Sequence, residues 1–203
     1  MKRQVWLLWL AISGVVVSYF YIDQPLVWFL LKNRSRDWVI LAYMANDIVF
    51  FMTSYIYIFY GYFLLCPRRW QLTHVIQKHL VLCNAVAITY FIKEGLKLMF
   101  GRTWAATFIC NNISLVQNHA YGFHWLTGNP MLASFPSGHV AVSIAFSTAL
   151  ALLYPAWRWI CVLLSLLVVI GQVGMYYHFV SDVIAGALLG YWIAVTLYKY
   201  YRS

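Results

Sequence analysis

Acidic residues are scarce in this chain of 203 residues, and charged residues of either sign are few. The sequence holds 5 Asp+Glu against 14 Lys+Arg, and charged side chains make up 9% of it. Soluble domains carry roughly 25% charged residues. Hydrophobic residues, in contrast, make up 64% of the chain. This balance excludes an ordinary soluble domain and predicts an integral membrane protein.

Other features that the sequence lacks exclude further classes of protein. The net charge of +9 comes mainly from the shortage of acids, and the cations lie in short clusters between apolar runs. A nucleic-acid-binding domain would gather them on one polar face, so we expect no nucleic-acid partner. The four cysteines show no C-x-x-C spacing, which argues against a zinc ribbon or a disulfide framework. No internal repeat divides the chain, so we treat residues 1–203 as a single domain.

Apolar runs of about 20 residues predict the membrane-spanning helices. The predicted spans are Val5–Ile22, Ile48–Cys66, Leu80–Phe100, Ser137–Tyr154, Trp157–Tyr177 and Val183–Tyr200. Pro25–Tyr43 mixes apolar and charged residues and is predicted to lie at the membrane interface. Residues 101–136 form a long loop. The expected fold is therefore all-α, a six-helix transmembrane bundle with an interfacial segment after the first helix and a long structured loop between helices 3 and 4.

The distribution of positive charge predicts the orientation of this bundle. Six helices place both chain ends on one side of the membrane, and Lys and Arg are more frequent on that side. The positive-inside rule then puts the ends in the cytoplasm and the 101–136 loop on the opposite face. Gly186 and Gly190 form a GxxxG pattern in the last span, which predicts close helix packing.

A helix start at Ser137 is the first candidate for a binding site. Pro136 ends the preceding segment, and Ser137 is a favourable N-cap residue. The N–H groups at such a helix start, Gly138 included, together with the helix dipole form a ready anion site. His139 in the first turn would lie beside the bound anion.

Cations at the end of the third predicted span point to the same kind of ligand. Lys93 and Lys97 are four residues apart and share a helix face, and Glu94 can pair with one of them. Gly101 allows a sharp turn that points Arg102 back toward the bundle. Snorkelling of the lysines to lipid headgroups is the alternative, and it suits Lys93 better than Lys97.

A histidine and an aspartate stand four residues apart near the start of the last span. On one helix face, the carboxylate of Asp182 can hold one ring nitrogen of His178, which leaves the other nitrogen free as a nucleophile. Two or three histidines with one aspartate could instead bind zinc. The nearby cations argue against a metal and favour phosphate. A supporting role for His119 or His124 in the long loop stays open.

Three short motifs in this order resemble the type 2 phosphatidic acid phosphatase (PAP2) superfamily of membrane lipid phosphatases. The family pattern is K-x6-R-P, then P-S-G-H, then S-R-x5-H-x3-D. Residues 136–139 match the middle motif in full. The first motif keeps Lys97 but has Trp104-Ala105 in place of Arg-Pro. The third keeps His178 and Asp182 but has Gly171-Gln172 in place of Ser-Arg.

The resemblance implies a metal-independent lipid phosphatase that uses no cofactor. It implies that His178 attacks phosphorus, that Asp182 orients it, and that His139 protonates the leaving oxygen. The expected phosphate-binding groups are Lys97, Arg102, Ser137 and Gly138, with Arg102 and Lys93 replacing the missing motif arginines.

The resemblance leaves the substrate and the wider setting open. Candidate substrates are undecaprenyl pyrophosphate, phosphatidylglycerol phosphate, phosphatidic acid and a lipid A phosphate. We expect a bacterial inner-membrane protein among membrane lipids, with its site facing the periplasm or the exterior. A lipid phosphotransferase and a non-catalytic phosphate-lipid-binding protein are the alternative functions. Association into a homo-oligomer stays open.

Overall fold

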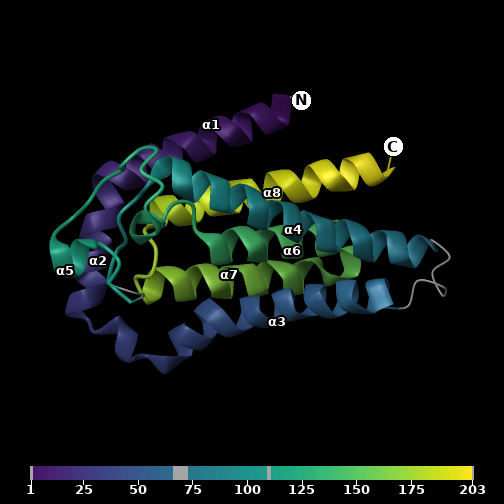
Figure 1. Ribbon diagram of the computed structural model, residues 1–203, viewed down its shortest axis with the longest axis horizontal. Coiled ribbons are helices and arrows are strands. Elements are labelled where there is room, and N and C mark those ends of the chain that lie inside the picture. The colour runs from purple at the N-terminus through teal and green to yellow at the C-terminus, as the bar shows by residue number, and fades with distance from the viewer. Residues whose placement is uncertain (1, 66–72, 109–110, 203) are drawn as a thin grey trace.

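The protein is an all-helical bundle in which the long helices run roughly side by side (Figure 1). The computed structural model describes residues 2–65, 73–108 and 111–202. Five described helical segments are long and apolar enough to cross a membrane. The bundle also contains a shorter apolar helix, α6. Within the described residues β-structure is limited to isolated bridges, so the expected fold class is confirmed.

The helices extend beyond most of the predicted spans. Their bounds are α1 Lys2–Val17, α2 Asp23–Lys32, α3 Val39–Leu65, α4 His74–Phe100, α5 Leu115–Asn118, α6 Gly138–Leu153, α7 Arg158–Gly174 and α8 Val180–Arg202. The largest difference is at α3, which begins nine residues before the expected start at Ile48. The 39–47 segment is also largely apolar, so the helix continues through it. Cys66, the expected last residue of that span, lies outside the described residues.

The segment after the first helix differs in part from the predicted interfacial stretch. Helix α1 passes through one π-helical turn, Ser18–Ile22, directly into α2. Figure 1 shows α2 bending away from α1 and crossing one end of the bundle. The 101–136 loop, with the short helix α5, lies at this same end. Residues 39–43 belong to α3 rather than to an interfacial segment.

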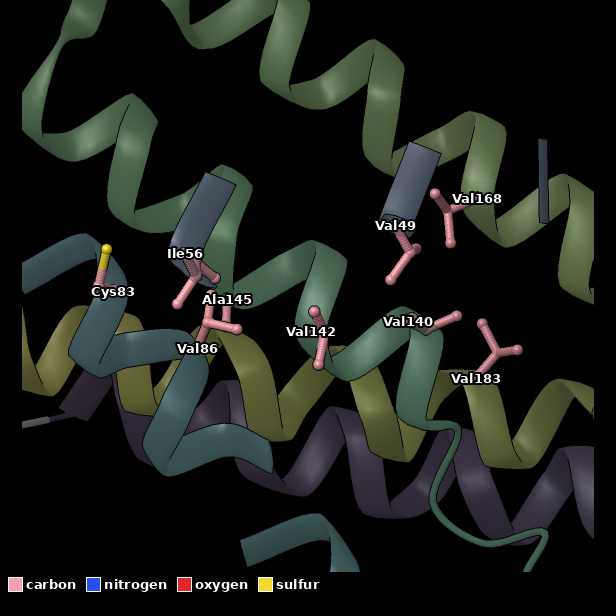
Figure 2. Packing of buried hydrophobic residues seen from close by; sticks show 9 residues of the cluster. All are labelled: Val49, Ile56, Cys83, Val86, Val140, Val142, Ala145, Val168 and Val183. Carbon is pink, nitrogen blue, oxygen red and sulfur yellow. The ribbon is translucent and has the colours of Figure 1, made fainter. Parts of the chain in front are cut away.

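Helix α6 lies at the centre of the bundle. Figure 2 shows Val140, Val142 and Ala145 of α6 among apolar side chains from its neighbours. These neighbours are Val49 and Ile56 of α3, Cys83 and Val86 of α4, Val168 of α7 and Val183 of α8. The packing therefore fixes the start of α6 relative to four other helices.

The predicted GxxxG packing is confirmed between α8 and α6. A Cβ added at Gly186 would lie 2.5 Å from the carbonyl oxygen of Ser137, and one at Gly190 would lie 2.2 Å from that of Ala141. Only glycine permits this approach of the two backbones. As a result, the first turns of α6 and α8 lie next to each other, and Ser137 N donates a hydrogen bond to Asp182 O at 3.0 Å.

Gly101 ends α4 and turns the chain into the long loop. It has the left-handed φ of 55°, and a Cβ there would lie 2.0 Å from the carbonyl oxygen of His124. Its N–H donates to Lys97 O, which closes the helix. The next residue, Arg102, is fully buried, which agrees with the predicted turn of this residue back toward the bundle.

Candidate active site

Three segments that are distant in sequence meet at the loop-bearing end of the bundle. His178 lies between α7 and α8, Asp182 lies in the first turn of α8, and His139 lies in the first turn of α6. The loop that follows α4 covers this end and contributes Ser134 and Arg102. Close packing of α6 against α8 explains why these polar groups come together.

His178 and Asp182 form the pair that their spacing predicted. The distance between His178 Nδ1 and Asp182 Oδ2 is 3.5 Å. Ser134 connects them, since its hydroxyl donates to Asp182 Oδ2 at 2.7 Å and lies 3.3 Å from His178 Nδ1. The N–H of Phe179 donates to the same carboxylate oxygen at 3.0 Å. These contacts engage Nδ1 and leave Nε2 as the ring nitrogen for chemistry.

The His178 ring is held in a buried setting. Its side chain is 3% exposed, and its ring centroid lies 5.1 Å from that of Trp104. Burial lowers the pKa of His178 below its ordinary value of 6.5, although Asp182 opposes this shift. The imidazole is therefore neutral at pH 7, which is the form that a nucleophile needs.

A cavity of about 660 Å³ opens beside the two histidines. Its polar and charged lining includes Lys93, Lys97, His139 and His178, and Gly138 from the α6 start also faces it. Aromatic side chains form much of the remaining wall: Phe50, Tyr57, Tyr90, Trp104, Phe108 and Tyr177. An anionic group with an apolar tail fits the chemistry of this lining.

Lys93 is buried inside the bundle, which argues against the alternative that it snorkels to lipid headgroups. Its residue is only 6% exposed, and its Nζ contacts Glu94. A Cβ added at Gly138 would lie 3.1 Å from Lys93 Cδ and 3.4 Å from its Nζ, so the lysine ends against the start of α6. Lys93 and Lys97 therefore both supply positive charge beside the helix N-terminus.

Ser137 occupies the predicted N-cap position of α6 without capping the helix through its side chain. Its hydroxyl is buried and has no hydrogen-bond partner among the described residues. A buried hydroxyl without a partner costs free energy, roughly 1–3 kcal/mol. Ser137 is not itself among the residues that line the cavity, but its unused hydroxyl lies directly before Gly138, which does line it.

Arg102 does not lie where its expected phosphate-binding role would place it. It is fully buried and is not among the residues that line the cavity. Its Nη1 donates to Asp182 Oδ1 at 2.6 Å, and its Nη2 donates to Asp23 Oδ2 at 2.7 Å. Burial alone would lower the pKa of Arg102, but the two carboxylates raise it instead. The guanidinium therefore stays charged as a partner of two buried acids.

The sequence did not identify Asp23 and Ser134 as site residues, and it suggested His119 and His124, which lie outside the cavity. Asp23 follows an apolar run and Ser134 sits in a loop, so neither carries a local signal. His119 and His124 do not line the cavity, and His119 packs against Trp28 with ring centroids 6.3 Å apart. Among the described residues there is also no group of three or more His, Cys, Asp or Glu side chains that could hold a metal ion.

A known protein family matches much of the sequence of this chain. The family model of the PAP2 superfamily matches residues 78–203, well over half of the chain. This chain belongs to the PAP2 superfamily. All three motif regions, from Lys97 to Asp182, lie within the matched residues.

Individual PAP2 relatives match shorter stretches. A lipid A 1-phosphatase of Rhizobium johnstonii is 36% identical over 80 residues, or 38% of this chain and 33% of the relative. One from Rhizobium etli has the same identity over the same length, with 34% of the relative covered. A PA-phosphatase related-family protein of Dictyostelium discoideum is 26% identical over 113 residues, 51% of this chain and 20% of the relative. The matches thus span about a third of the length of two relatives and a fifth of the third, and no solved structure matches the chain.

Two residues stand where the PAP2 motifs have arginine, and both line the cavity. Trp104 replaces the arginine of the first motif and packs on His178. Lys97 Nζ lies 5.7 Å from the centroid of the Trp104 ring. Gln172 replaces the arginine of the third motif, and its side-chain amide donates to Ala45 O at 2.8 Å. Both motif-arginine positions of the cavity wall are therefore uncharged, and the lysines in the lining are the motif lysine Lys97 and Lys93, which lies four residues before it.

Proposed function

We propose that this PAP2 protein is a lipid phosphatase that cleaves a phosphate mono- or diphosphate ester through a phosphohistidine. The observation that carries the proposal is the buried His178–Asp182–Ser134 arrangement, which opens onto a cavity with two lysines and His139. It combines an oriented neutral nucleophile, a second histidine and positive charge within one site. The names of the two Rhizobium relatives favour a lipid A phosphate among the candidate substrates.

In the first step, Nε2 of His178 attacks phosphorus and the bond from phosphorus to the lipid oxygen breaks. Asp182 holds Nδ1 and balances the positive charge that develops on the imidazole. His139, whose side chain is exposed to the cavity, gives a proton to the departing oxygen. Lys97, Lys93, Ser137 and the Gly138 N–H bind the phosphoryl oxygens.

In the second step, water attacks the phosphohistidine. His139 takes the proton from this water, the phosphorus–nitrogen bond breaks, and inorganic phosphate leaves. No metal ion is needed in either step, since the lysines and the helix start supply the positive charge. Arg102 is reassigned in this scheme from phosphate binding to holding Asp182.

The test is phosphate release in detergent from a panel of lipid phosphates with EDTA present. The panel contains lipid A, undecaprenyl pyrophosphate, phosphatidylglycerol phosphate and phosphatidic acid. We expect wild-type protein and His124→Ala to release phosphate, and His178→Ala to lose at least about 10³-fold in rate, because the nucleophile is gone. His124 is exposed and outside the cavity, so it is a matched control.

Each contrary outcome of this assay points to a different function. Equal rates for wild type and His178→Ala would refute the nucleophile. Loss of activity with EDTA would refute the metal-free mechanism. Release that requires an acceptor lipid would identify a phosphotransferase, and no turnover of any substrate would support a non-catalytic lipid-binding protein.

We also propose that the site faces the periplasm or exterior of a bacterial inner membrane. The clusters of Lys and Arg on the side of the chain ends support this orientation. A single cysteine at the exposed Thr127, in a background without the native cysteines, should react with an impermeant maleimide added to intact spheroplasts. Reaction only after the membrane is opened would reverse the orientation.

A further inference from the structure

The part of the chain before the PAP2 match contributes one fully buried acid to the site region. Asp23 is 1% exposed, although Tyr21 and Ile22 just before it are 75% and 40% exposed. The π-helical turn Ser18–Ile22 comes immediately before Asp23 and changes the register with which α2 faces the bundle. Turns of this kind occur frequently at functional sites.

The Asp23 carboxylate accepts hydrogen bonds from residues that surround the candidate nucleophile. Its Oδ1 accepts the N–H of Ser181 at 3.1 Å. Its Oδ2 accepts Arg102 Nη2 at 2.7 Å, the hydroxyl of Ser181, and the hydroxyl of Tyr121 at 3.2 Å. Asp23 therefore reaches the first turn of α8, where Asp182 lies.

Arg102 divides its guanidinium between the two acids. One edge binds Asp23, and the other binds Asp182 Oδ1 at 2.6 Å, which leaves Asp182 Oδ2 for Ser134 and His178. Aromatic rings enclose the guanidinium, with its central carbon 4.6 Å from the Phe179 ring centroid and 4.8 Å from that of Phe123. The guanidinium is therefore shielded from solvent, with both carboxylates as its charged partners.

The charges of this cluster do not cancel. Asp23, Asp182 and Arg102 together carry a net charge of −1. The other titratable groups that face His178 are Lys97 from α4, His139 from α6, and Tyr177 beside it in the cavity wall, while Tyr121 from the loop bonds to Arg102. Lys97 and His139 line the cavity in front of His178. The excess negative charge of Asp23, Asp182 and Arg102 lies behind His178.

We propose that Asp23 is a positioning residue for the phosphatase reaction, acting through Arg102 to fix Asp182 and to keep excess negative charge behind His178. This inference rests on the proposed function. Without Asp23, the full charge of Arg102 falls on Asp182, and the cluster becomes neutral. The positive charge that forms on the His178 ring during attack then loses support, so the rate falls while substrate binding is unchanged.

A role limited to fastening α2 to the bundle is the competing explanation, because breaking one partner of a buried ion pair destabilises a protein in any case. The pH profile separates the two roles. A neutral cluster disfavours a protonated His178, so the acidic limb of kcat moves to lower pH. Loss of fastening alone lowers the unfolding temperature and leaves the limb in place.

The experiment compares Asp23→Asn, Ser181→Ala and Asp37→Asn in kcat, KM, pH profile and thermal unfolding. Asp23→Asn keeps the side-chain shape, and we expect kcat to fall roughly 10- to 100-fold, KM to change less than about twofold, and the acidic limb to move down by about one pH unit. Ser181→Ala removes a hydroxyl contact without removing charge, so it should lower the unfolding temperature without moving the limb. Asp37→Asn changes an exposed pair with Arg34 and should match wild type.

Asp23→Asn with wild-type kcat and limb would overturn the inference, as would a limb shift of the same size in Ser181→Ala. Histidine NMR in detergent micelles gives a readout that does not depend on turnover. With signals assigned by His178→Ala, the Asp23→Asn protein should show a lower His178 pKa than wild type. If wild type hydrolyses no lipid phosphate but this titration shift is present, the proposed function fails while the coupling of Asp23 to His178 stands. If wild type is active and the shift is absent, the inference alone fails.

Discussion

The replacement of Lys93 by methionine tests the proposal that lysines bind the substrate phosphate in the absence of the motif arginines. Lys93 is buried against Gly138, and it shares the cavity with Lys97. Methionine has a similar length and no charge, so it fits the mostly apolar surroundings of the lysine stem. The substitution therefore removes one cation from the proposed phosphate site with little change in packing.

The structure sets the expected size of this effect. A hydrogen bond to a charged group contributes about 1.5–3 kcal/mol, or roughly 10- to 150-fold in affinity. Lys93 also contacts Glu94, whose side chain is 47% exposed. A pair with such an exposed acid is weak, so most of the lysine charge remains available, but the competition places Lys93 near the lower end of the range. We expect about a 10-fold rise in KM for Lys93→Met.

Glu94→Gln provides the matched control, with the opposite sign. It removes the acid that competes with phosphate for Lys93 Nζ and keeps the side-chain shape. KM should fall by about two- to threefold, as expected for the loss of a weak, exposed pair. Lys97→Met, which removes the motif lysine, should raise KM at least as much as Lys93→Met.

The assay is the initial rate of phosphate release at varied substrate in mixed micelles, with inorganic phosphate as a competitive inhibitor to report affinity directly. Unchanged KM and unchanged phosphate inhibition in Lys93→Met, together with a large effect in Lys97→Met, would refute the argument. Lys93 would then be only an internal partner of Glu94.

Three further predictions follow from the burial of His178 and from the packing of α8 on α6. Burial lowers the pKa of His178 below 6.5. In the pH–rate profile, kcat/KM should therefore stay constant between pH 7 and 6.5 and fall only at lower pH, where the ring binds a proton. A decline that begins above pH 6.5 would contradict this. For the same reason the unfolded state takes up this proton first, so stability should decrease as pH falls through 6.5. Gly190→Leu should lower the unfolding temperature and the rate of phosphate release, because its Cβ would lie 2.2 Å from Ala141 O and force α8 away from α6. Gly61→Leu is the control in the thermal unfolding measurement, since a Cβ at Gly61 meets nothing within 4 Å.

The helices and the pairing of His178 with Asp182 could be predicted because their signals are local. Apolar runs of sufficient length form helices in a membrane, since their backbone groups must bond internally. The four-residue spacing of His178 and Asp182 brought them together even though His178 precedes α8. The start of α6 was likewise predictable from Pro136 and Ser137.

The role of Arg102 could not be predicted, because its partners are distant in sequence. Its charge and its place beside a motif lysine suggested a phosphate ligand. The folded chain instead brings Asp23 and Asp182 to it from 79 and 80 residues away. A buried cation binds the acids that packing places beside it, and no pattern near Arg102 identifies them.

The sequence by itself determined that this protein is a helical membrane bundle with the P-S-G-H and H-x3-D elements of a PAP2 site at one end. Hydrophobic length and short-range spacing are sufficient for that, since both act within a few helical turns. Only the tertiary structure decided which cations face the cavity. Packing of α6 against α4 and α8 turned Lys93 toward the helix start and left Arg102 enclosed between two carboxylates, because buried charges require partners and the fold alone determines which partners are near.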